Sequence, residues 1–263
     1  MPSGKTIETY AEEDVINQLL SSSPEFKNYY ETERDNIDNI YWIKSNEEIE
    51  STLGFQRGQR GKAYLLKGKT GIKKLIVLEQ IPPTLNDLFI VAHEMAHFLI
   101  INKGFPAISP CLSDGLENDE KIARIGLAAS MSTMIHDPLC NSLLKKYGIS
   151  YGNLFKNHVI NMLKNFSNIE EPVPNTYFGI ELVFKYVLVN LHDNTIIDDN
   201  ICLEKYNQFF ENKFPHITDE GKFILDLVKI WGYNTPGRVS YLYQDILNAM
   251  KLNEVCKLEK PIA

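Results

Sequence analysis

The stretch His93-Glu94-Met95-Ala96-His97 constrains this chain more than any other, because it places two imidazoles and a carboxylate within five residues. On an α-helix, residues four apart lie on one face, so His93 and His97 can reach one metal ion. Glu94 is turned by about 100° from His93 and can approach that ion without binding it. Zinc accepts histidine nitrogen, and a catalytic zinc keeps one position open for water. The stretch therefore predicts two ligands and a base, and it requires a third ligand elsewhere.

The flanking residues predict the helix that such a site needs. Two prolines at 82–83 disfavour helix on their N-terminal side. Thr84 and Asp87 then form the sequence pattern of a capping box, and apolar residues recur at helical spacing after it. Gly104 is typical of the position just beyond a helix end. We therefore expect a helix over 84–103. The alternative interpretation is that the histidines are buried structural residues or the remnant of a lost site.

The third ligand is expected among the residues just downstream of this helix. The candidates are Asp114, Glu117, Asp119, Glu120 and His136. Glu120 is preferred because it stands in the first turns of a second predicted helix, where small Ala123 would let the two helices approach closely. Glu117, one turn earlier on the same face, is the second choice. A carboxylate at this place in a helix also has a simpler interpretation, as a surface group that stabilises the helix dipole.

His136 has a separate interpretation at the other end of the second helix. It could donate a hydrogen bond to a ligand or stabilise an oxyanion. The simpler interpretation, which we favour, is a cation at a helix C-terminus. Tyr147, Tyr151 and Tyr177 are further oxyanion donors among which the sequence does not choose.

Two runs of sequence resemble a known family. The run from Leu85 to Leu99 resembles the active-site helix of the ImmA/IrrE family of zinc metallopeptidases. The run from Glu120 to Met131 resembles its second helix, in which Glu precedes Ala and a small-residue segment. The chain thus looks like a Glu-type zincin over residues 70–135. It departs from the family at Ala96, where Gly is common, and at Ile90, where Thr is common.

The resemblance implies a particular site and reaction. His93, His97 and Glu120 would hold one zinc ion per chain, and Glu94 would act as the base. The implied activity is hydrolysis of a peptide bond in a specific protein or peptide substrate. Two alternatives remain open: a catalytically silent zincin-like module that binds or regulates a partner, and a zinc hydrolase of a non-peptide amide. The presence of Glu94 favours an enzyme, because a purely structural metal site needs no base.

Composition narrows the class of protein. The formal net charge of -7 argues against a general binder of nucleic-acid backbones. No apolar run approaches the roughly 18 residues of a membrane span, and the N-terminus lacks the apolar core of a secretory signal. The four cysteines form no C-x-x-C pair and are interpreted as reduced thiols. We therefore expect a cytoplasmic protein without a membrane partner.

The predicted fold is α+β and mainly helical, a zincin-like arrangement of a small twisted sheet and the metal helix packed against a helical lobe. The N-terminal lobe spans 1–104, and the helical lobe that supplies the third ligand spans 105–263. The sheet is expected from a strand at 40–43 and a hairpin with strands at 62–67 and 72–79.

The hairpin turn contains Gly68-Lys69-Thr70, which echoes a phosphate-binding loop. That motif needs Gly where Ala63 stands and a helix after the turn, so we reject it. One strand of the hairpin could instead bind an extended peptide along a free sheet edge. The alternative is an internal strand with no free edge.

The remaining sequence predicts helices. They are expected over 7–20, from Phe26 to Tyr30, from Ser45 to Gly54, over 114–136, 139–147, 153–166, 176–192, 200–213, 218–231 and 237–251. Asp137-Pro138 is expected to end the helix that begins near Asp114, because the residue before a proline disfavours helical geometry.

Overall fold

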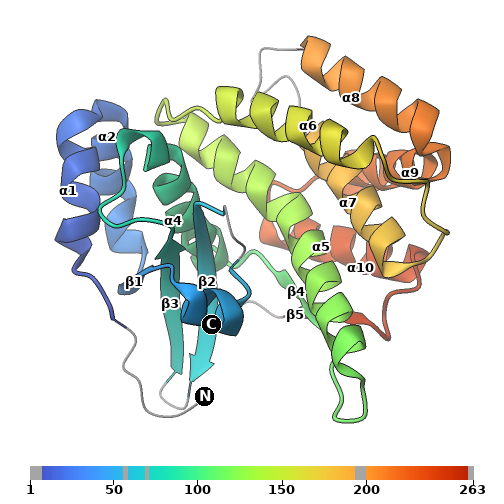
Figure 1. Ribbon diagram of the computed structural model, residues 1–263, viewed down its shortest axis with the longest axis horizontal. Coiled ribbons are helices and arrows are strands. Elements are labelled where there is room, and N and C mark those ends of the chain that lie inside the picture. Colours follow the sequence, from blue (N-terminus) through green and yellow to red (C-terminus); the bar gives the residue numbers. More distant parts are fainter. Residues whose placement is uncertain (1–7, 56–58, 69–70, 193–199, 260–263) are drawn as a thin grey trace. The chain divides into compact units, whose positions relative to one another are not determined.

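The structure is a computed structural model that describes residues 8–55, 59–68, 71–192 and 200–259. Those residues form ten α-helices, a three-stranded mixed sheet and a two-stranded sheet, so the predicted α+β, mainly helical class is confirmed (Figure 1). The helices are α1 Glu12–Ser22, α2 Pro24–Glu33, α3 Glu47–Leu53, α4 Leu88–Asn102, α5 Asn118–Lys145, α6 Gly152–Phe166, α7 Tyr177–Leu191, α8 Asn200–Lys213, α9 Pro215–Trp231 and α10 Pro236–Ala249. The strands are β1 Ile40–Lys44, β2 Gly61–Gly68, β3 Gly71–Leu78, β4 Ala107–Pro110 and β5 Cys256–Glu259.

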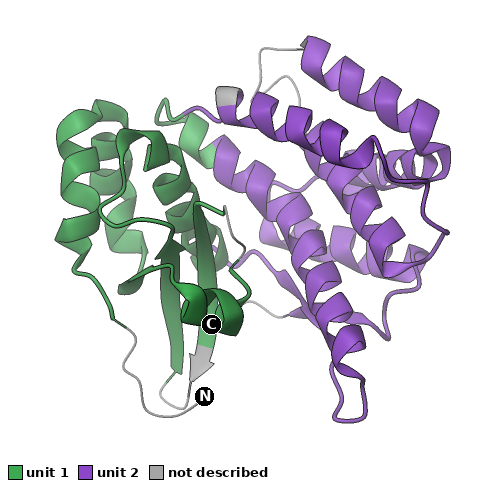
Figure 2. Cartoon of the chain, in the orientation of Figure 1, with its two compact units in different colours: residues 1–102, 143–149 green, residues 103–142, 150–263 purple. Residues whose placement is uncertain are grey.

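The chain divides into two compact units, coloured separately in Figure 2. Unit 1 comprises residues 1–102 and 143–149, and unit 2 comprises 103–142 and 150–263. The sequence-based division placed everything after residue 104 in the second lobe. In the structure, the end of α5 returns to unit 1, so this one helix has residues in both units.

The sheet of unit 1 has the strand order β1-β3-β2. β1 runs parallel to β3, while β2 pairs antiparallel with β3 as the predicted hairpin, with Gly61 opposite Leu78. A strand therefore follows the turn, in agreement with our rejection of the phosphate-binding loop; Lys69 and Thr70 lie outside the described residues. β2 is an outer strand of the sheet, so the alternative of a hairpin with no edge strand does not hold.

The two faces of this sheet are covered differently, because side chains alternate along each strand. Leu75 and Val77 pack with Ile43 and with Ile49 of α3. On the alternate face, Lys74 turns toward α4 and its Nζ donates to Asn102 Oδ1 at 2.8 Å. α4 is thus held against the sheet face opposite α3.

The predicted start of the helix that carries His93 and His97 is confirmed. A 3-10 turn over Leu85–Asp87 leads into α4, and Thr84 and Asp87 form the reciprocal capping box that the sequence indicated. The Asp87 carboxylate accepts from the Thr84 amide at 2.8 Å and from its hydroxyl at 2.6 Å. Gly104 follows the helix with φ of +82°, a backbone conformation that glycine adopts at little cost.

The predicted end of the second helix at Asp137-Pro138 is wrong. α5 continues through Pro138 to Lys145 and absorbs the separate helix expected over 139–147. A proline inside a helix costs about 3 kcal/mol, since it removes one hydrogen bond and crowds the preceding turn. Burying a large apolar side chain contributes roughly 1.5–3 kcal/mol. Met134 and Leu144, on either side of the proline, are both fully buried, so packing on both flanks outweighs the local penalty.

Unit 2 contains helices close to those predicted and one feature that was missed. β4 and β5 pair antiparallel, with Ala107 opposite Glu259. Each strand has four residues, too few for a period-two pattern to stand out. No helix among the described residues is both long and apolar enough to cross a membrane.

Candidate metal centre

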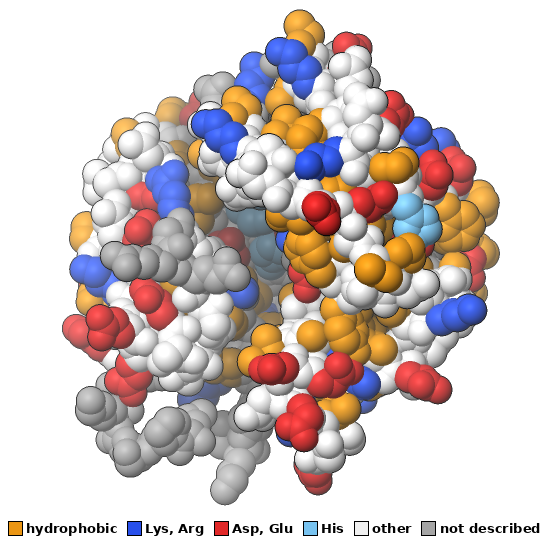
Figure 3. Space-filling view, turned by 45° about the vertical axis from the view of Figure 1, so that its right-hand side comes forward, with side chains coloured by type: hydrophobic (Ala, Val, Ile, Leu, Met, Phe, Trp, Pro, Cys, Tyr) orange, Lys and Arg blue, Asp and Glu red, His pale blue; other side chains and the backbone are white. Residues whose placement is uncertain are grey.

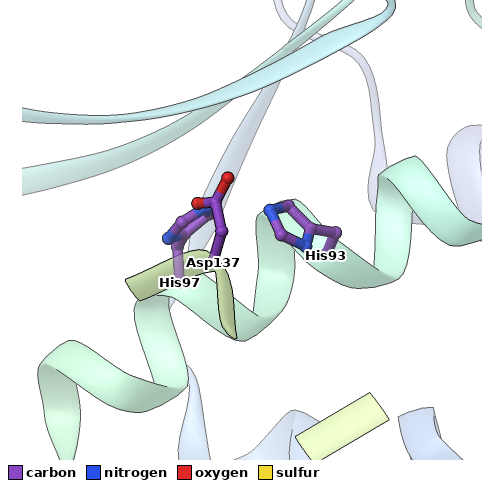
Figure 4. Close-up of side chains that lie close together, drawn as sticks. All are labelled: His93, His97 and Asp137. Atoms are coloured by element: carbon purple, nitrogen blue, oxygen red, sulfur yellow. The ribbon is translucent and has the colours of Figure 1, made fainter. Parts of the chain in front are cut away.

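Three side chains converge on one point at the middle of α4. Ligand atoms of His93, His97 and Asp137 all lie within 4.8 Å of one another, and none of the three residues is exposed. Figure 4 shows the two imidazoles projecting from α4 and the Asp137 carboxylate from α5, with all three turned toward one another. This group could hold a metal ion.

The donor set fits zinc. A tetrahedral zinc ion with bonds of about 2.0–2.1 Å needs ligand atoms roughly 3.3 Å apart. The ligand atoms of the three residues lie within 4.8 Å of one another, so they exceed this spacing by no more than about 1.5 Å. Two imidazole nitrogens and one carboxylate oxygen fill three positions and leave the fourth for water or substrate, as in catalytic zinc sites.

His93 and His97 are the accessible residues in the middle of α4, because the residues around them are buried. Between Val91 and Ile100 only His93 and His97 are partly accessible, and every other residue of that segment is buried. The His93 and His97 rings lie perpendicular with centroids 4.8 Å apart. One turn earlier, the Phe89 ring packs against His93 at 5.4 Å. The helix is thus closely packed where it carries the expected ligands.

Asp137 owes its direction to the buried residue before it. His136 points into unit 2, where its Nε2 lies 2.9 Å from the Pro106 carbonyl oxygen, and burial lowers the pKa of its imidazole. Successive residues on a helix differ in direction by about 100°, so burying His136 leaves Asp137 on another side of α5. The structure therefore places His136 against the backbone of its own unit rather than in the metal group.

Glu120, the expected third ligand, is not a member of the group. It lies in the first turn of the same helix, 17 residues before Asp137, which is about 25 Å along the axis at 1.5 Å per residue. Its carboxylate accepts from Arg124 Nε at 2.7 Å and from the Tyr177 hydroxyl, and these two donors lower its pKa. Glu120 has the partners of a surface ion pair.

The other acidic candidates lie on the surface at the same end of α5. Asp114, Glu117 and Asp119 are exposed, and none belongs to the metal group. The carboxylate that the structure brings to the histidines was missed because Asp137-Pro138 was interpreted as a helix end. One signal could have found it: Asp137 is the sole acidic residue between Lys121 and Lys145.

Glu94, the expected base, is 8% exposed and lies beside the sheet edge. Its Oε2 accepts a hydrogen bond from the Ala63 amide of β2 at 2.6 Å. The Glu79 amide donates to the Arg60 carbonyl across the hairpin, which orients residues 60, 62 and 64 toward β3. Ala63 alternates with them and directs its amide away from β3, to Glu94. The base candidate is therefore fixed by the edge strand.

The three tyrosines considered as oxyanion donors differ in their surroundings. Tyr147 donates to Glu33 at 2.7 Å, and Tyr177 donates to Glu120. Burial raises the pKa of Tyr151, and the nearby Asp137 carboxylate raises it further. Of the three, Tyr151 is the one whose pKa is also raised by Asp137.

Charged side chains of both signs are interspersed on the molecular face in Figure 3, and the described residues there form no continuous basic surface. This distribution agrees with the net charge of -7.

Comparisons of the chain with protein-family models, with curated proteins and with solved structures find no match.

Proposed function

We propose that this protein is a zinc-dependent hydrolase that cleaves a peptide bond in a protein or peptide substrate. One observation carries the proposal: His93, His97 and Asp137 bring their ligand atoms within 4.8 Å of one another, and Glu94 is adjacent to His93 on the same helix. Two imidazoles, a third ligand and a neighbouring carboxylate base are the parts of a metal-assisted hydrolytic site. In this proposal Asp137 replaces the Glu120 ligand that the ImmA/IrrE resemblance implied.

Each residue has a distinct role. His93, His97 and Asp137 would hold the zinc ion, which when bound polarises a carbonyl group and makes a water molecule acidic near neutral pH. Glu94 would act as the general base, accepting a proton from the attacking water and returning it to the leaving amine. The Ala63 amide fixes one oxygen of the Glu94 carboxylate, so the base is oriented before substrate arrives.

The sheet edge supports an extended peptide as the substrate. β2 is the outer strand and its residues 61, 63 and 65 direct backbone groups away from β3. Ala63 of this edge contacts Glu94, so a peptide that pairs along β2 would pass beside the base. A small non-peptide amide would gain nothing from such an edge.

The test is Glu94→Gln in the full chain, with metal content measured by mass spectrometry and hydrolysis measured on a peptide library and a set of small amides. The amide oxygen of glutamine can still accept from Ala63, but glutamine cannot take a proton. We expect about one zinc per chain in both proteins and a loss of peptide hydrolysis of about 10²–10⁴-fold in the variant. Full activity of Glu94→Gln would refute this mechanism. Zinc without hydrolysis in the wild type would favour the silent binding module.

A further inference from the structure

An ion pair connects the N-terminal end of β2 with the N-terminal end of α4. Arg60, one residue before β2, donates from Nε to Asp87 Oδ1 at 3.0 Å and also contacts that oxygen through Nη2. Asp87 ends the 3-10 turn that leads into α4. Its side chain is 9% exposed, and that of Arg60 is 33% exposed. The pair therefore joins two elements that are separate in sequence.

The Asp87 carboxylate has more partners than a helix cap requires. Its Oδ2 accepts from the Thr84 amide and hydroxyl and from Gln80 Nε2 at 3.1 Å. These contacts complete the cap with one oxygen. The other oxygen is directed at Arg60, so the guanidinium contributes a connection to β2 rather than to the helix start itself.

Immediately after Arg60, β2 passes close to α4 at Gly61. A Cβ atom at Gly61 would lie 2.5 Å from Ile90 Cγ2 and 3.5 Å from Glu94 Cγ. Real side chains do not pack at the first distance, so only glycine permits this approach. Two residues further on, Ala63 donates to Glu94. The spacing of strand and helix at Gly61 thus determines whether the 2.6 Å bond to the base forms.

We propose that Arg60 and Asp87 are positioning residues for Glu94. Their ion pair holds the start of β2 against the start of α4, so that the Ala63 amide meets the carboxylate that serves as the base. This assignment rests on the proposed function for its catalytic meaning, but the geometry it describes exists without substrate or metal. It also predicts which substitution will release Glu94 while leaving the α4 cap intact.

The test measures amide hydrogen exchange by NMR in the full-length wild type and in Arg60→Met, without substrate. The Ala63 amide points away from β3, whereas the Tyr64 amide points toward it, so Tyr64 reports the stability of the hairpin itself. We expect the ratio of Ala63 to Tyr64 exchange rates to rise about tenfold in Arg60→Met. Glu94→Ala sets the ratio for complete loss of the bond.

Arg34→Met is the matched control, because it removes a guanidinium from another carboxylate of unit 1: Arg34 Nε pairs with Glu12 Oε1. It should leave the Ala63 to Tyr64 ratio unchanged. If Arg60→Met does not fold, Arg60→Lys keeps the charge without the fork and should give an intermediate rise. A ratio that stays at the wild-type value in the folded Arg60 variant, or that does not rise in Glu94→Ala, overturns the proposal.

Activity supplies the second readout. If the protein hydrolyses peptides, Arg60→Met should lower kcat with zinc content unchanged, because the ligands are untouched while the base is less well oriented. If no hydrolysis is found in the wild type, the exchange ratio still decides the positioning role. Failure of the proposed function and failure of this inference are therefore distinguishable.

Discussion

Glu120 and Asp137 are two carboxylates on one helix, and the structure gives them opposite surroundings. Glu120 lies in the first turn of α5 with Arg124 and Tyr177 as partners. Asp137 lies 17 residues later, with His93 and His97 as neighbours. The sequence pattern favoured Glu120 as the ligand, whereas Asp137 is the residue whose carboxylate lies near the two imidazoles. The comparison shows that motif spacing indicates which residue types a site needs, whereas tertiary packing determines which of those residues lie close together.

The largest expected effect is on metal binding, in a direct test of this comparison. Asp137→Ala should lose zinc, with affinity reduced by more than the roughly 10–100-fold that removal of an outer partner costs. Glu120→Ala should retain about one zinc per chain. Both are measured by titration of the apo protein and by metal content after purification. Zinc retained by Asp137→Ala and lost by Glu120→Ala would reverse the assignment.

Two glycines allow the next comparison, between the start of β2 and the Glu120 end of α5. Gly61→Ala should destabilise the protein by about 1–3 kcal/mol, because the new Cβ would lie 2.5 Å from Ile90. Gly126→Ala should be neutral or stabilise by up to about 1 kcal/mol, since the atom it meets, at 3.0 Å, is the flexible end of Glu181 and helix favours Ala.

Denaturant unfolding measures both glycine variants. Gly61→Ala should also weaken protection of the Ala63 amide, whereas Gly126→Ala should not. Equal destabilisation by the two substitutions would mean that the space for a side chain at Gly61 is no smaller than the space at Gly126.

A third carboxylate, that of Asp87, makes the stability of the fold depend on pH. Burial raises the pKa of Asp87, but hydrogen bonds from Thr84, Arg60 and Gln80 outweigh it and lower the pKa below its ordinary value. Because the folded pKa is the lower one, Asp87 stabilises the fold above the unfolded pKa of about 3.9, and this contribution is lost as pH falls through the folded value.

Asp87→Asn should therefore be less stable than the wild type by about 1–2 kcal/mol at pH 7. The difference should shrink as pH falls below about 4. Paired denaturant titrations at several pH values measure it. A difference that grows toward acid pH would contradict the assigned direction.

The smallest expected effect is at Glu120, whose carboxylate is partly exposed. Tyr177→Phe removes one donor to Glu120, and partly exposed pairs of this kind contribute little. The melting temperature should change by no more than about 2 °C, with zinc content unchanged. A loss of zinc in Tyr177→Phe would connect Glu120 to the metal after all.

Local patterns were sufficient for much of unit 1. The Thr84–Asp87 capping box, the hairpin and the helix that carries His93 and His97 all depend on residues close in sequence, and all three formed where the sequence indicated. The four-residue strands β4 and β5 were beyond such reasoning, because they are short and pair across about 150 residues of chain.

The sequence by itself determined two imidazoles on one helical face, with a carboxylate between them, because helix geometry relates residues four apart. Only the tertiary structure decided which acid joins them. A proline predicted a helix end at Asp137, but burial of Met134 and Leu144 on either side carried α5 through it. That packing energy is summed over contacts distant in sequence, and so a local pattern could not predict that α5 continues past Asp137.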